Sequence, residues 1–558
     1  MTHVGALRPS QPVENCLSSR RILILFTVPF TRRFMHCVIG SGPAGTACAK
    51  ALLARGAEVR MLDVGLELEP ERVRLAREMA AVKSSQWRPA QIAGLKRDMD
   101  VSAKGLPQKL AFGSNYPYRE AEDHVPWSGH GASVRPSLAL GGFSTLWGAA
   151  MLPHSDADME DWPVKNRDLA QHYRAVLAFT GLAAQRDDLE ELFPLHCENP
   201  GALNSSRQAD QLLENLGRHR AGLRAAGWRY GRARLALRTA DSPQGPGCVY
   251  CKMCLYGCPY SCIYNSADTV REMRADGKFE YQSDVIVTRL REEAGKVFVS
   301  GYHRRTRAPL AMECERVYLA AGIVPTTQIL LRSQNAYDRP VRARDSQYFV
   351  FPLVTARRAR GVCDEPLFTL SQVFIELNHP RVSRRAVHLQ IYAHNDIIGR
   401  VVRQFLGPLG AFARPIEERM LIVQGYLHSD ESPEIEMTLK RAGEKDFLQL
   451  NAQPNPATRR SVKNVLRELL RNAFRLGAAP APTMLQLTLP GQGFHSGGTF
   501  PMRVQPEPFE SDLLGRPHGW SRIHAVDASV LPSVPATTIT LPIMANAHRI
   551  GWEAAELD

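Results

Sequence analysis

The sequence Val38-Ile39-Gly40-Ser41-Gly42-Pro43-Ala44-Gly45 places three glycines at G-x-G-x-x-G spacing directly after a short apolar run. Gly40 allows a tight turn out of a strand, Gly42 allows the backbone to approach a pyrophosphate, and Gly45 allows the next helix to pack on the sheet. The helix expected over 44–55 points its N-terminal N–H groups at that anion. This stretch therefore predicts a dinucleotide-binding turn.

An acidic residue follows the next predicted strand. Residues 58–62 (EVRML) are expected to form a second strand that ends at Asp63, 18 residues after Gly45. A carboxylate at this distance can accept a hydrogen bond from a ribose hydroxyl. An ordinary glycine turn beside a surface aspartate is the simpler alternative. However, strand, glycine loop, helix and acidic strand end occur together here, which favours the nucleotide site.

Length and composition limit the class of protein. At ~100–200 residues per domain, 558 residues correspond to two or three domains. The 44% hydrophobic and 22% charged residues are typical of a soluble globular protein, and no apolar run approaches the ~20 residues that span a bilayer. The net charge of +13 comes from scattered Lys and Arg without a nucleic-acid motif. We therefore expect no nucleic-acid partner. The positive charge would, however, attract an acidic partner or a membrane surface.

Residues 1–34 are expected to be an extension outside the fold. Arg20-Arg21 followed by the apolar run 22–26 resembles a twin-arginine export signal. The run is short, however, Arg32-Arg33 follows it, and no small-residue cleavage site is present. We expect Met35 to be the natural start and the protein to be cytoplasmic, with twin-arginine export to the periplasm as the alternative.

Several segments predict secondary structure without a chemical role. A helix is expected over 69–82, followed by a long irregular connection to Arg119. Residues 316–322 form an apolar run capped by small residues, which is typical of a buried strand that meets a cofactor. Alternating runs within 340–450 predict an antiparallel sheet with one face covered.

Two later segments, 397–416 and 458–476, also predict secondary structure. Residues 397–416 are apolar with three arginines and could lie on a membrane surface, but their glycines and prolines favour a packed loop or a subunit contact. Thr458 is expected to cap a helix that runs to Leu476 and is ended by Gly477. Its apolar face predicts core packing and consists of Val462, Val465, Leu466, Leu469 and Phe474.

Five of the eleven cysteines fall within fifteen residues: Cys248, Cys251, Cys254, Cys258 and Cys262. The first four have the C-x2-C-x2-C-x3-C-P spacing of a bacterial ferredoxin run. No second run exists, so we consider a three-iron cluster, or a four-iron cluster completed by Cys262 or a distant cysteine. A structural zinc, a thiol cluster or a structural turn is the alternative.

These features together resemble the glucose-methanol-choline (GMC) oxidoreductase family of FAD flavoproteins over most of residues 36–556. The resemblance is carried by the glycine box with Asp63, the loop 141–148 (GGFSTLWG), 161–163 (DWP), 317–322 (VYLAAG), 495–502 (HSGGTFPM) and 526–532 (VDASVLP). It implies an α/β protein in which a discontinuous Rossmann-like FAD-binding domain joins an α+β substrate domain built on an antiparallel sheet.

The implied domain boundaries follow the order of the motifs. The FAD-binding domain would comprise 35–195, 241–335 with the cysteine-rich segment, and 491–558 with an active-site histidine. Substrate or cap helices would occupy 196–240, and the substrate-binding domain 336–490. Some relatives attach FAD covalently through a histidine in the loop corresponding to 141–148, which contains none here. We therefore expect non-covalent FAD.

The resemblance also implies the cofactor-binding residues. Val287 would contact the adenine side through its backbone, and Asp527-Ala528 would face the isoalloxazine or the phosphates. The full set is Gly40, Ser41, Gly42, Pro43, Gly45, Asp63, Gly141, Gly142, Ser144, Val287, Asp527 and Ala528.

His495 matches the family's active-site histidine. The family oxidises a CH–OH group of an alcohol, sugar, polyol or sterol to a carbonyl, with hydride transfer to flavin N5, and a histidine base suits this reaction. Without the resemblance, a histidine among glycines would be read as a turn residue. The family's second His or Asn corresponds here to Val534 or a neighbour. His495 would then act alone, or Asn546, His548 or His428 would substitute.

The missing second base motivates an alternative function. The chain could be a flavin-binding electron-transfer or assembly subunit without independent alcohol oxidation, or a structural zinc protein on a flavin fold. The main prediction is a dehydrogenase or oxidase acting on a small hydroxylated substrate. An iron–sulfur cluster would favour a dehydrogenase that passes electrons to a quinone, a cytochrome or another acceptor protein.

Overall fold

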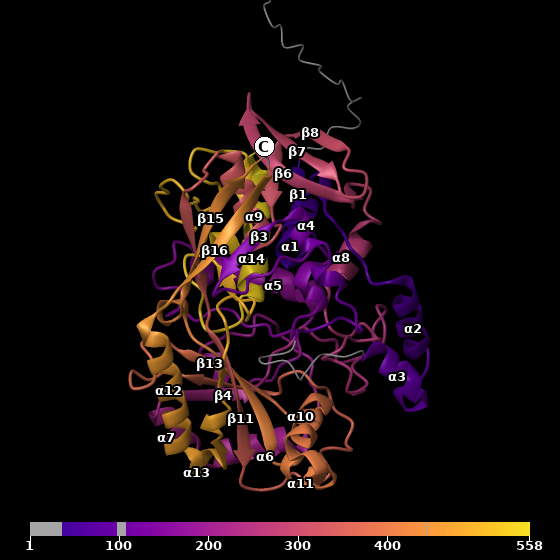
Figure 1. The fold of residues 1–558 in the computed structure, drawn as a ribbon, viewed down its shortest axis with the longest axis vertical. Helices are drawn as coiled ribbons and strands as arrows, with labels where there is room; N and C mark the ends of the chain where they lie inside the picture. The colour runs from indigo at the N-terminus through magenta and orange to yellow at the C-terminus, as the bar shows by residue number, and fades with distance from the viewer. Residues whose placement is uncertain (1–35, 97–107, 444, 558) are drawn as a thin grey trace, which may run out of the picture. The chain divides into compact units, whose positions relative to one another are not determined.

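A parallel sheet carries the glycine-rich turn (Figure 1). The computed structural model describes residues 36–96, 108–443 and 445–557, so the predicted extension 1–34 lies outside the described residues. The sheet has the order β20-β9-β1-β2-β5, with every pair parallel. Its strands are β1 (His36–Ile39), β2 (Val59–Leu62), β5 (Phe279–Gln282), β9 (Arg316–Leu319) and β20 (Ile523–Ala525).

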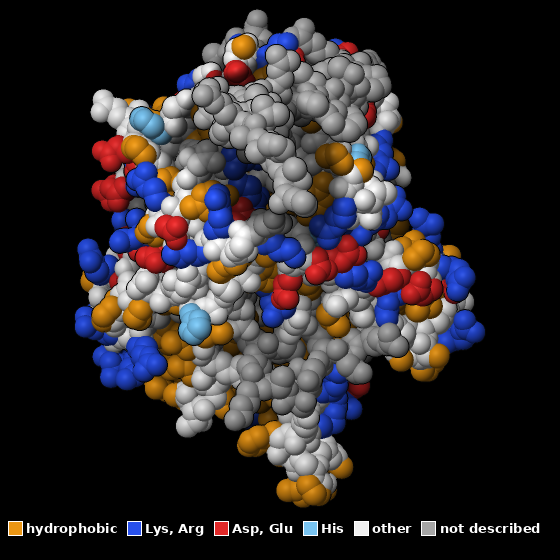
Figure 2. Space-filling model, turned by 45° about the horizontal axis from the view of Figure 1, so that its top comes forward, with side chains coloured by type: hydrophobic (Ala, Val, Ile, Leu, Met, Phe, Trp, Pro, Cys, Tyr) orange, Lys and Arg blue, Asp and Glu red, His pale blue; other side chains and the backbone are white. Residues whose placement is uncertain are grey.

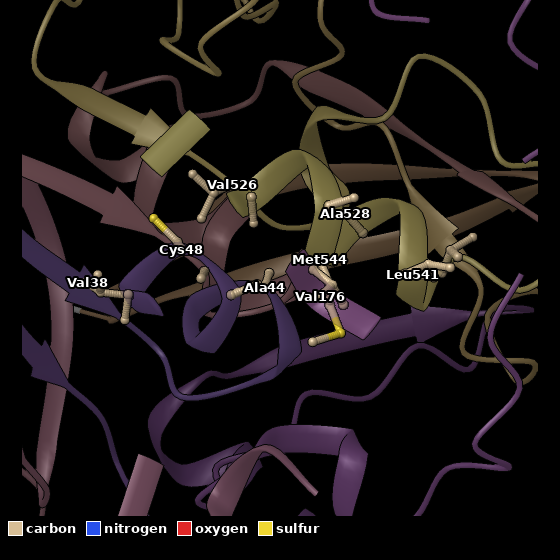
Figure 3. Packing of buried hydrophobic residues seen from close by; sticks show 14 of the residues in the cluster. Val38, Ala44, Cys48, Val176, Val526, Ala528, Leu541 and Met544 are labelled. Atoms are coloured by element: carbon tan, nitrogen blue, oxygen red, sulfur yellow. The ribbon is translucent and has the colours of Figure 1, made fainter. Parts of the chain in front are cut away.

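Three helices from distant parts of the chain pack together beside this sheet. They are α1 (Pro43–Ala54), α5 (Asn166–Thr180) and α14 (Thr540–Ala554). Small residues on α1 allow close contact: Ala44 and Cys48 lie against the yellow C-terminal helix, which contributes Met544 (Figure 3). The hydrophobic core of this half therefore joins the first and last parts of the chain.

A seven-stranded antiparallel sheet forms the second half. Its order is β17-β11-β14-β13-β12-β4, with β18 paired to β11. One face packs on α6 (Arg207–Arg218) and α12 (Pro456–Arg471) through apolar residues at alternate positions, such as Phe349 and Leu389. The strands are β4 (Trp228–Arg232), β11 (Tyr348–Thr355), β12 (Val373–Leu377), β13 (Val387–Tyr392), β14 (Met420–Tyr426), β17 (Ala478–Pro480) and β18 (Gln486–Leu487).

Two smaller sheets connect to these halves. One has the order β19-β10-β15-β16-β3 and the other is the antiparallel β6-β7-β8. Their strands are β3 (Trp127–His130), β10 (Pro340–Asp345), β15 (Glu434–Ala442), β16 (Lys445–Gln453), β19 (Ser496–Gly497), β6 (Val285–Glu293), β7 (Lys296–His303) and β8 (Pro309–Cys314). The fold is thus mixed α/β with one parallel sheet and separate antiparallel sheets, which confirms the predicted class at this level.

The remaining α-helices are α2 (Pro70–Ala80), α3 (Pro89–Leu95), α4 (Ala121–His124), α7 (Arg220–Ala225), α8 (Ser266–Met273), α9 (Ile323–Ser333), α10 (Asp396–Leu406), α11 (Arg414–Glu417) and α13 (Ala473–Leu476).

Two predictions about secondary structure need correction. Part of the expected irregular connection before Arg119 is helical, as α3. The segment 397–416 is not a loop, because α10 covers its first half with Asn395 as the N-cap.

The predicted cap of the helix beginning near Thr458 is also wrong. Asn455 caps α12 by accepting from the Ala457 N–H, and Pro456 occupies the first helical turn. The helix breaks at Asn472, and Phe474 is 86% exposed instead of lying on the apolar face. The order Asn-Pro is itself a helix-start signal, because proline suits the first turn.

Lys and Arg side chains are spread over the surface in Figure 2 and interleaved with Asp and Glu. None of the helices in the described ranges combines the length and the hydrophobicity that a membrane-crossing helix requires. Exposed apolar side chains do occur on and after α10, including Phe405 and Phe412. The expected peripheral membrane contact of this segment stays a prediction.

Candidate active site

A large cavity lies at the carboxyl ends of the parallel strands. It encloses about 1400 Å³ of empty space, including its open mouth. The residues that line it include Ile39 and Leu62 at the ends of β1 and β2, Ala320 after β9, and Asp527 after β20. Ligands of open α/β sheets bind at this edge. The position of the cavity therefore agrees with the site expected from the glycine-rich turn.

The glycine-rich turn presents free backbone donors to this cavity. Gly42 is the N-cap of α1, and no side chain caps the helix or places an acid in its first turn. A Cβ atom built on Gly42 would meet nothing within 4 Å, whereas one on Gly45 would lie 2.0 Å from the Gly40 carbonyl oxygen. Gly45 thus permits the packing of α1 on the turn, and Gly42 leaves open space beside an uncapped helix N-terminus, where an anion is stabilised.

Ser41 connects three parts of the site. Its hydroxyl donates to the Asp63 carboxylate and accepts from the Gly141 N–H at 2.9 Å. Tyr281 donates to the same carboxylate at 3.0 Å. Burial raises the pKa of Asp63 to about 6, against the lowering effect of these hydrogen bonds. The network fixes a carboxylate on the cavity wall with an unused acceptor capacity.

Most of the predicted cofactor residues line the cavity: Gly40, Ser41, Gly42, Pro43, Asp63, Gly142, Val287, Asp527 and Ala528. Three others lie behind the wall. Gly45 packs α1, Gly141 donates to Ser41, and the Ser144 hydroxyl donates to the Gly141 carbonyl at 2.6 Å. The structure therefore brings all twelve residues to one region, in two different positions.

Asp527 performs a structural task at the cavity. Its carboxylate accepts from the Gly322 N–H at 2.8 Å, the Thr326 hydroxyl at 2.5 Å and the Ser529 N–H at 3.0 Å. Burial raises the pKa of Asp527. These donors occupy the carboxylate, so it joins α9 to the turn after β20 instead of pointing a free charge at a ligand.

His495 lies between two cavity-lining residues, Phe494 and Ser496. Its ring is stacked on Tyr426 of β14, and its carbonyl accepts from the Ser346 N–H at 2.9 Å. Within the described residues, Nδ1 of His495 is buried without a hydrogen-bond partner. Burial lowers the pKa of His495 to about 3, with a smaller contribution from His388. The imidazole is therefore neutral at pH 7.

Sequence reasoning singled out only His428 among the other histidines of this region. His154, His388 and His428 each have a buried Nε2 atom without a partner in the described part of the chain. His428 and His495 both help to lower the pKa of His154, which burial takes to about 3. His388 Nδ1 lies 2.5 Å from the buried Glu376 carboxylate. These three rings and His495 thus form a histidine cluster.

The signals for the two missed histidines were weak. His388 lies on the face of its strand opposite the apolar core, and His154 follows a proline in an irregular segment. The proposed substitutes Asn546 and His548 lie elsewhere: Asn546 contacts Met502 and Arg549, and His548 pairs with His172 at 2.9 Å.

Val534 forms hydrogen bonds near the histidines through its backbone and not through its side chain. Its side chain is fully buried, its N–H donates to the Ser429 hydroxyl at 3.1 Å, and its carbonyl accepts from the Ser429 N–H. Thr537, three residues later, lies 3.1 Å from His154 Nδ1 through its hydroxyl. The Thr537 hydroxyl is therefore a polar group of this segment that contacts one of the buried histidines.

The five clustered cysteines lie close together in space. Cys248 and Cys258 contribute to raising the pKa of the Cys262 thiol, and Cys254 and Cys258 do the same for Cys251. Among the described residues, no three of these sulfur atoms lie within 4.8 Å of one another. Four thiolates on one tetrahedral zinc ion would lie about 3.8 Å apart, so the spacing is wider than a single ion requires.

Backbone N–H groups point at these sulfur atoms. The Cys262 N–H donates to Cys258 Sγ at 3.3 Å, and the Thr369 N–H donates to Cys254 Sγ at 3.5 Å. Donation to Cys258 by the Cys262 thiol and by backbone N–H groups lowers the pKa of Cys258 to about 7. Such bonds stabilise thiolates, which are the form that binds metals.

The geometry defines a class of protein: a mixed α/β fold with a cavity at the ends of a parallel sheet, and a second, antiparallel sheet whose residue Tyr426 stacks on His495 beside that cavity. Pyridoxine 4-oxidase from Mesorbium loti has a similar fold, with a TM-score of 0.57 and 14% sequence identity over 93% of this chain and 99% of that chain. At this identity the likeness concerns the fold. No family model matches the chain, and no curated protein matches it.

Proposed function

We propose that this protein is an FAD-dependent oxidoreductase of the GMC type that oxidises a CH–OH group to a carbonyl, with His495 as the base. One observation carries the proposal: a single cavity runs from an uncapped helix N-terminus and Asp63 to the backbone on both sides of His495. The fold similarity to an oxidase supports the same class of reaction. The catalytic half would be the Rossmann-like domain predicted from the sequence.

The residues present fit a non-covalent dinucleotide. The backbone N–H groups at the start of α1 would bind the pyrophosphate, and the Asp63 carboxylate would accept from a ribose hydroxyl. The backbone at Val287 would border the adenine, and Ala528 would border the ring system. FAD would supply the acceptor of the hydride that leaves the substrate carbon.

His495 would hold the proton released by the substrate hydroxyl. A neutral imidazole is required for this role, and burial keeps His495 neutral at pH 7. Its Nδ1 atom has no partner among the described residues, and its orientation is set by Tyr426 and by the Ser346 N–H. Apolar and aromatic neighbours, including Phe494 and Tyr348, would limit water access.

The substrate would lie against the face of β11, β13 and β14 that carries Tyr426, the residue stacked on His495. Tyr348 and Tyr426 are stacked there at 5.0 Å, and Gln390 and Tyr392 follow on β13. Aromatic rings beside amide and phenol groups suit a small hydroxylated ring compound, because they combine apolar contact with hydrogen bonding.

The cysteine segment would hold an iron–sulfur cluster through Cys248, Cys251, Cys254 and Cys258. The ferredoxin-like spacing and the N–H groups aimed at the sulfurs support this assignment. The segment is close to the cavity loop: Lys109 interacts electrostatically with Cys254, and its ammonium donates to the Trp147 carbonyl at 3.0 Å. A cluster here would favour a dehydrogenase.

The decisive test is anaerobic titration of the purified holoprotein with alcohols, polyols, sterols and pyridoxine while flavin absorbance is recorded. At least one compound is expected to bleach the flavin in wild type. His495→Ala should retain FAD but slow bleaching by roughly 10²- to 10⁴-fold. Near wild-type bleaching in the variant would disprove the base assignment. Bound flavin that no compound bleaches would favour the electron-transfer or assembly alternative, and absence of flavin would reject both.

Iron and acid-labile sulfide analysis of anaerobically purified protein tests the cluster separately. Stoichiometric iron and sulfide are expected in wild type and a large loss in Cys258→Ser, with Cys197→Ser as the matched control. Cys197 is a half-buried free thiol outside the cluster. Zinc without sulfide would contradict the assignment.

A further inference from the structure

A second group of metal-ligand side chains lies outside the proposed cavity and outside the cysteine cluster. It consists of Cys363 in the loop after β11, His394 just before α10, and Glu417 in α11. Cys363 Sγ lies 4.0 Å from His394 Nδ1 and 3.7 Å from a Glu417 carboxylate oxygen. His394 Nδ1 lies 3.9 Å from the same oxygen. Three potential ligand atoms of three chemical types therefore form a nearly equilateral triangle.

The size of this triangle fits one metal ion. Zinc binds sulfur at about 2.3 Å and nitrogen or oxygen at about 2.0–2.2 Å, so ligands at tetrahedral angles lie roughly 3.4–3.6 Å apart. The observed separations of 3.7–4.0 Å need to shrink by only a few tenths of an ångström. A thiolate, an imidazole and a carboxylate together suit zinc, whereas calcium and magnesium prefer oxygen ligands.

One buried side chain, that of Gln208, binds the backbone of both His394 and Glu417. Gln208 of α6 accepts from the His394 N–H at 2.7 Å and donates to the Glu417 carbonyl at 3.0 Å. Arg403 binds the other carboxylate oxygen of Glu417 at 2.8 Å, which directs the free oxygen at Cys363 and His394. Groups behind the ligands that fix their orientation are typical of metal sites.

The third ligand is also restrained. The Cys363 carbonyl accepts from the Lys252 ammonium at 2.9 Å, and the loop packs through Ala359, Val362 and Leu367. Cys363 is half-buried, while His394 and Glu417 are buried. A fourth position would therefore open toward solvent and take water.

A nucleophilic role explains these residues less well. A reactive cysteine needs a lowered pKa, but burial and the carboxylates of Glu417 and Glu418 raise the pKa of Cys363 to about 11. The carboxylate also contacts the thiol directly instead of acting only through the imidazole. A bound divalent cation would reverse this balance and stabilise the thiolate.

We propose that Cys363, His394 and Glu417 form a zinc site with water as the fourth ligand. The metal would join the loop after β11, the end of β13 and α11, and would thereby anchor the α10–α11 segment that carries Phe405 and Phe412 at the surface. This site is independent of the proposed FAD and iron–sulfur sites.

The test is metal analysis of the full-length protein after incubation with zinc at micromolar concentration and removal of free metal. Cys363→Ser and Glu417→Gln should each contain about one zinc ion less per chain than wild type, with unchanged iron. Cys197→Ser should match wild type. Glu417→Gln preserves shape and can still accept from Arg403, so it guards against loss through misfolding.

Cobalt substitution provides the spectroscopic criterion. Wild type loaded with Co²⁺ should show tetrahedral d–d bands and a thiolate charge-transfer band that Cys363→Ser reduces and His394→Gln shifts. Zinc should also slow proteolysis within 397–416 in wild type but not in Cys363→Ser. Equal zinc content in wild type and both ligand variants, or no zinc uptake by wild type, would overturn the proposal.

Discussion

The imidazole of His495 is stacked on the phenol ring of Tyr426, with ring centroids 4.8 Å apart and planes inclined by 26°. The two residues come from a loop near the C-terminus and from the central strand β14 of the antiparallel sheet. The stacking therefore connects the loop that lines the cavity on both sides of His495 with the antiparallel sheet, and it fixes the direction in which the proposed base points.

Removal of this stacking partner should slow the reaction without loss of the cofactor. Tyr426→Ala is expected to reduce the rate of flavin reduction by about tenfold, because an aromatic pair contributes roughly 0.5–1.5 kcal/mol beyond area burial. Tyr426→Phe keeps the ring and should stay near wild type. Stopped-flow flavin reduction with an identified substrate measures both. Equal rates in the alanine and phenylalanine variants would show that the stacking does not position His495.

Asp63 should determine FAD affinity. Asp63→Asn preserves the side-chain shape but removes the charged acceptor, and hydrogen bonds to charged groups contribute about 1.5–3 kcal/mol. FAD binding should weaken roughly ten- to hundredfold, as measured by fluorescence quenching on reconstitution. The exposed Asp123 provides the control, Asp123→Asn. Because the pKa of Asp63 is about 6, wild-type affinity should also fall as the pH drops below this value.

Two glycines of the same turn should respond differently to alanine. In Gly45→Ala the new methyl group meets the Gly40 carbonyl oxygen, and the overpacking should lower the free energy of unfolding by roughly 1–3 kcal/mol. In Gly42→Ala the methyl group enters open cavity, at a φ of −64° that alanine tolerates. Thermal unfolding of the apoprotein should therefore change only for Gly45→Ala. FAD binding should weaken in Gly42→Ala, and normal affinity there would place the pyrophosphate elsewhere.

His154 should make the protein sensitive to acid. It is fully buried, and its pKa is lowered to about 3 from an ordinary 6.5. Between these pH values the unfolded chain binds a proton that the folded protein excludes, so the free energy of unfolding falls as the pH falls. Asp63 and Asp345, whose pKa values are raised to about 6, act in the opposite direction.

A paired substitution isolates this effect. From pH 7 to pH 5, the free energy of unfolding of His154→Gln should fall by about 1–2 kcal/mol less than that of wild type. The two aspartates are present in both proteins and cancel. His130 is exposed, so His130→Gln should follow wild type. Urea titrations at each pH measure the difference, and parallel pH dependence of His154→Gln and wild type would contradict a buried neutral His154.

Local patterns predicted the first strand, the glycine-rich turn, the helix after it and the second strand of the parallel sheet. The spacing of Gly40, Gly42 and Gly45 specifies a turn that needs no distant partner, and Asp63 follows from the length of one helix and one strand. The histidine cluster around His495 could not be predicted in the same way. His154 and His388 converge on His495 only because a strand of the antiparallel sheet and an irregular segment meet the C-terminal loop.

The errors at the helices have local causes. Asn455 followed by Pro456 is a stronger start signal than Thr458, but the apolar periodicity of the helix begins only after them. In the segment 397–416, Gly399 suggested a loop but lies inside α10, where its missing side chain leaves room for the Arg403 and Glu417 side chains. Tertiary contacts outweighed helix propensity at that position.

The outermost position of β20 has a consequence for biosynthesis. This strand comprises residues 523–525 and pairs directly with β9, while α14 packs against α1 from the other end of the chain. A ribosome releases the N-terminal glycine turn long before these last elements. Until they are made, β9 lacks its contact with β20, and α1 lacks its contact with α14. Loading with the flavin would therefore be post-translational, and truncation of even the last 35 residues should abolish it.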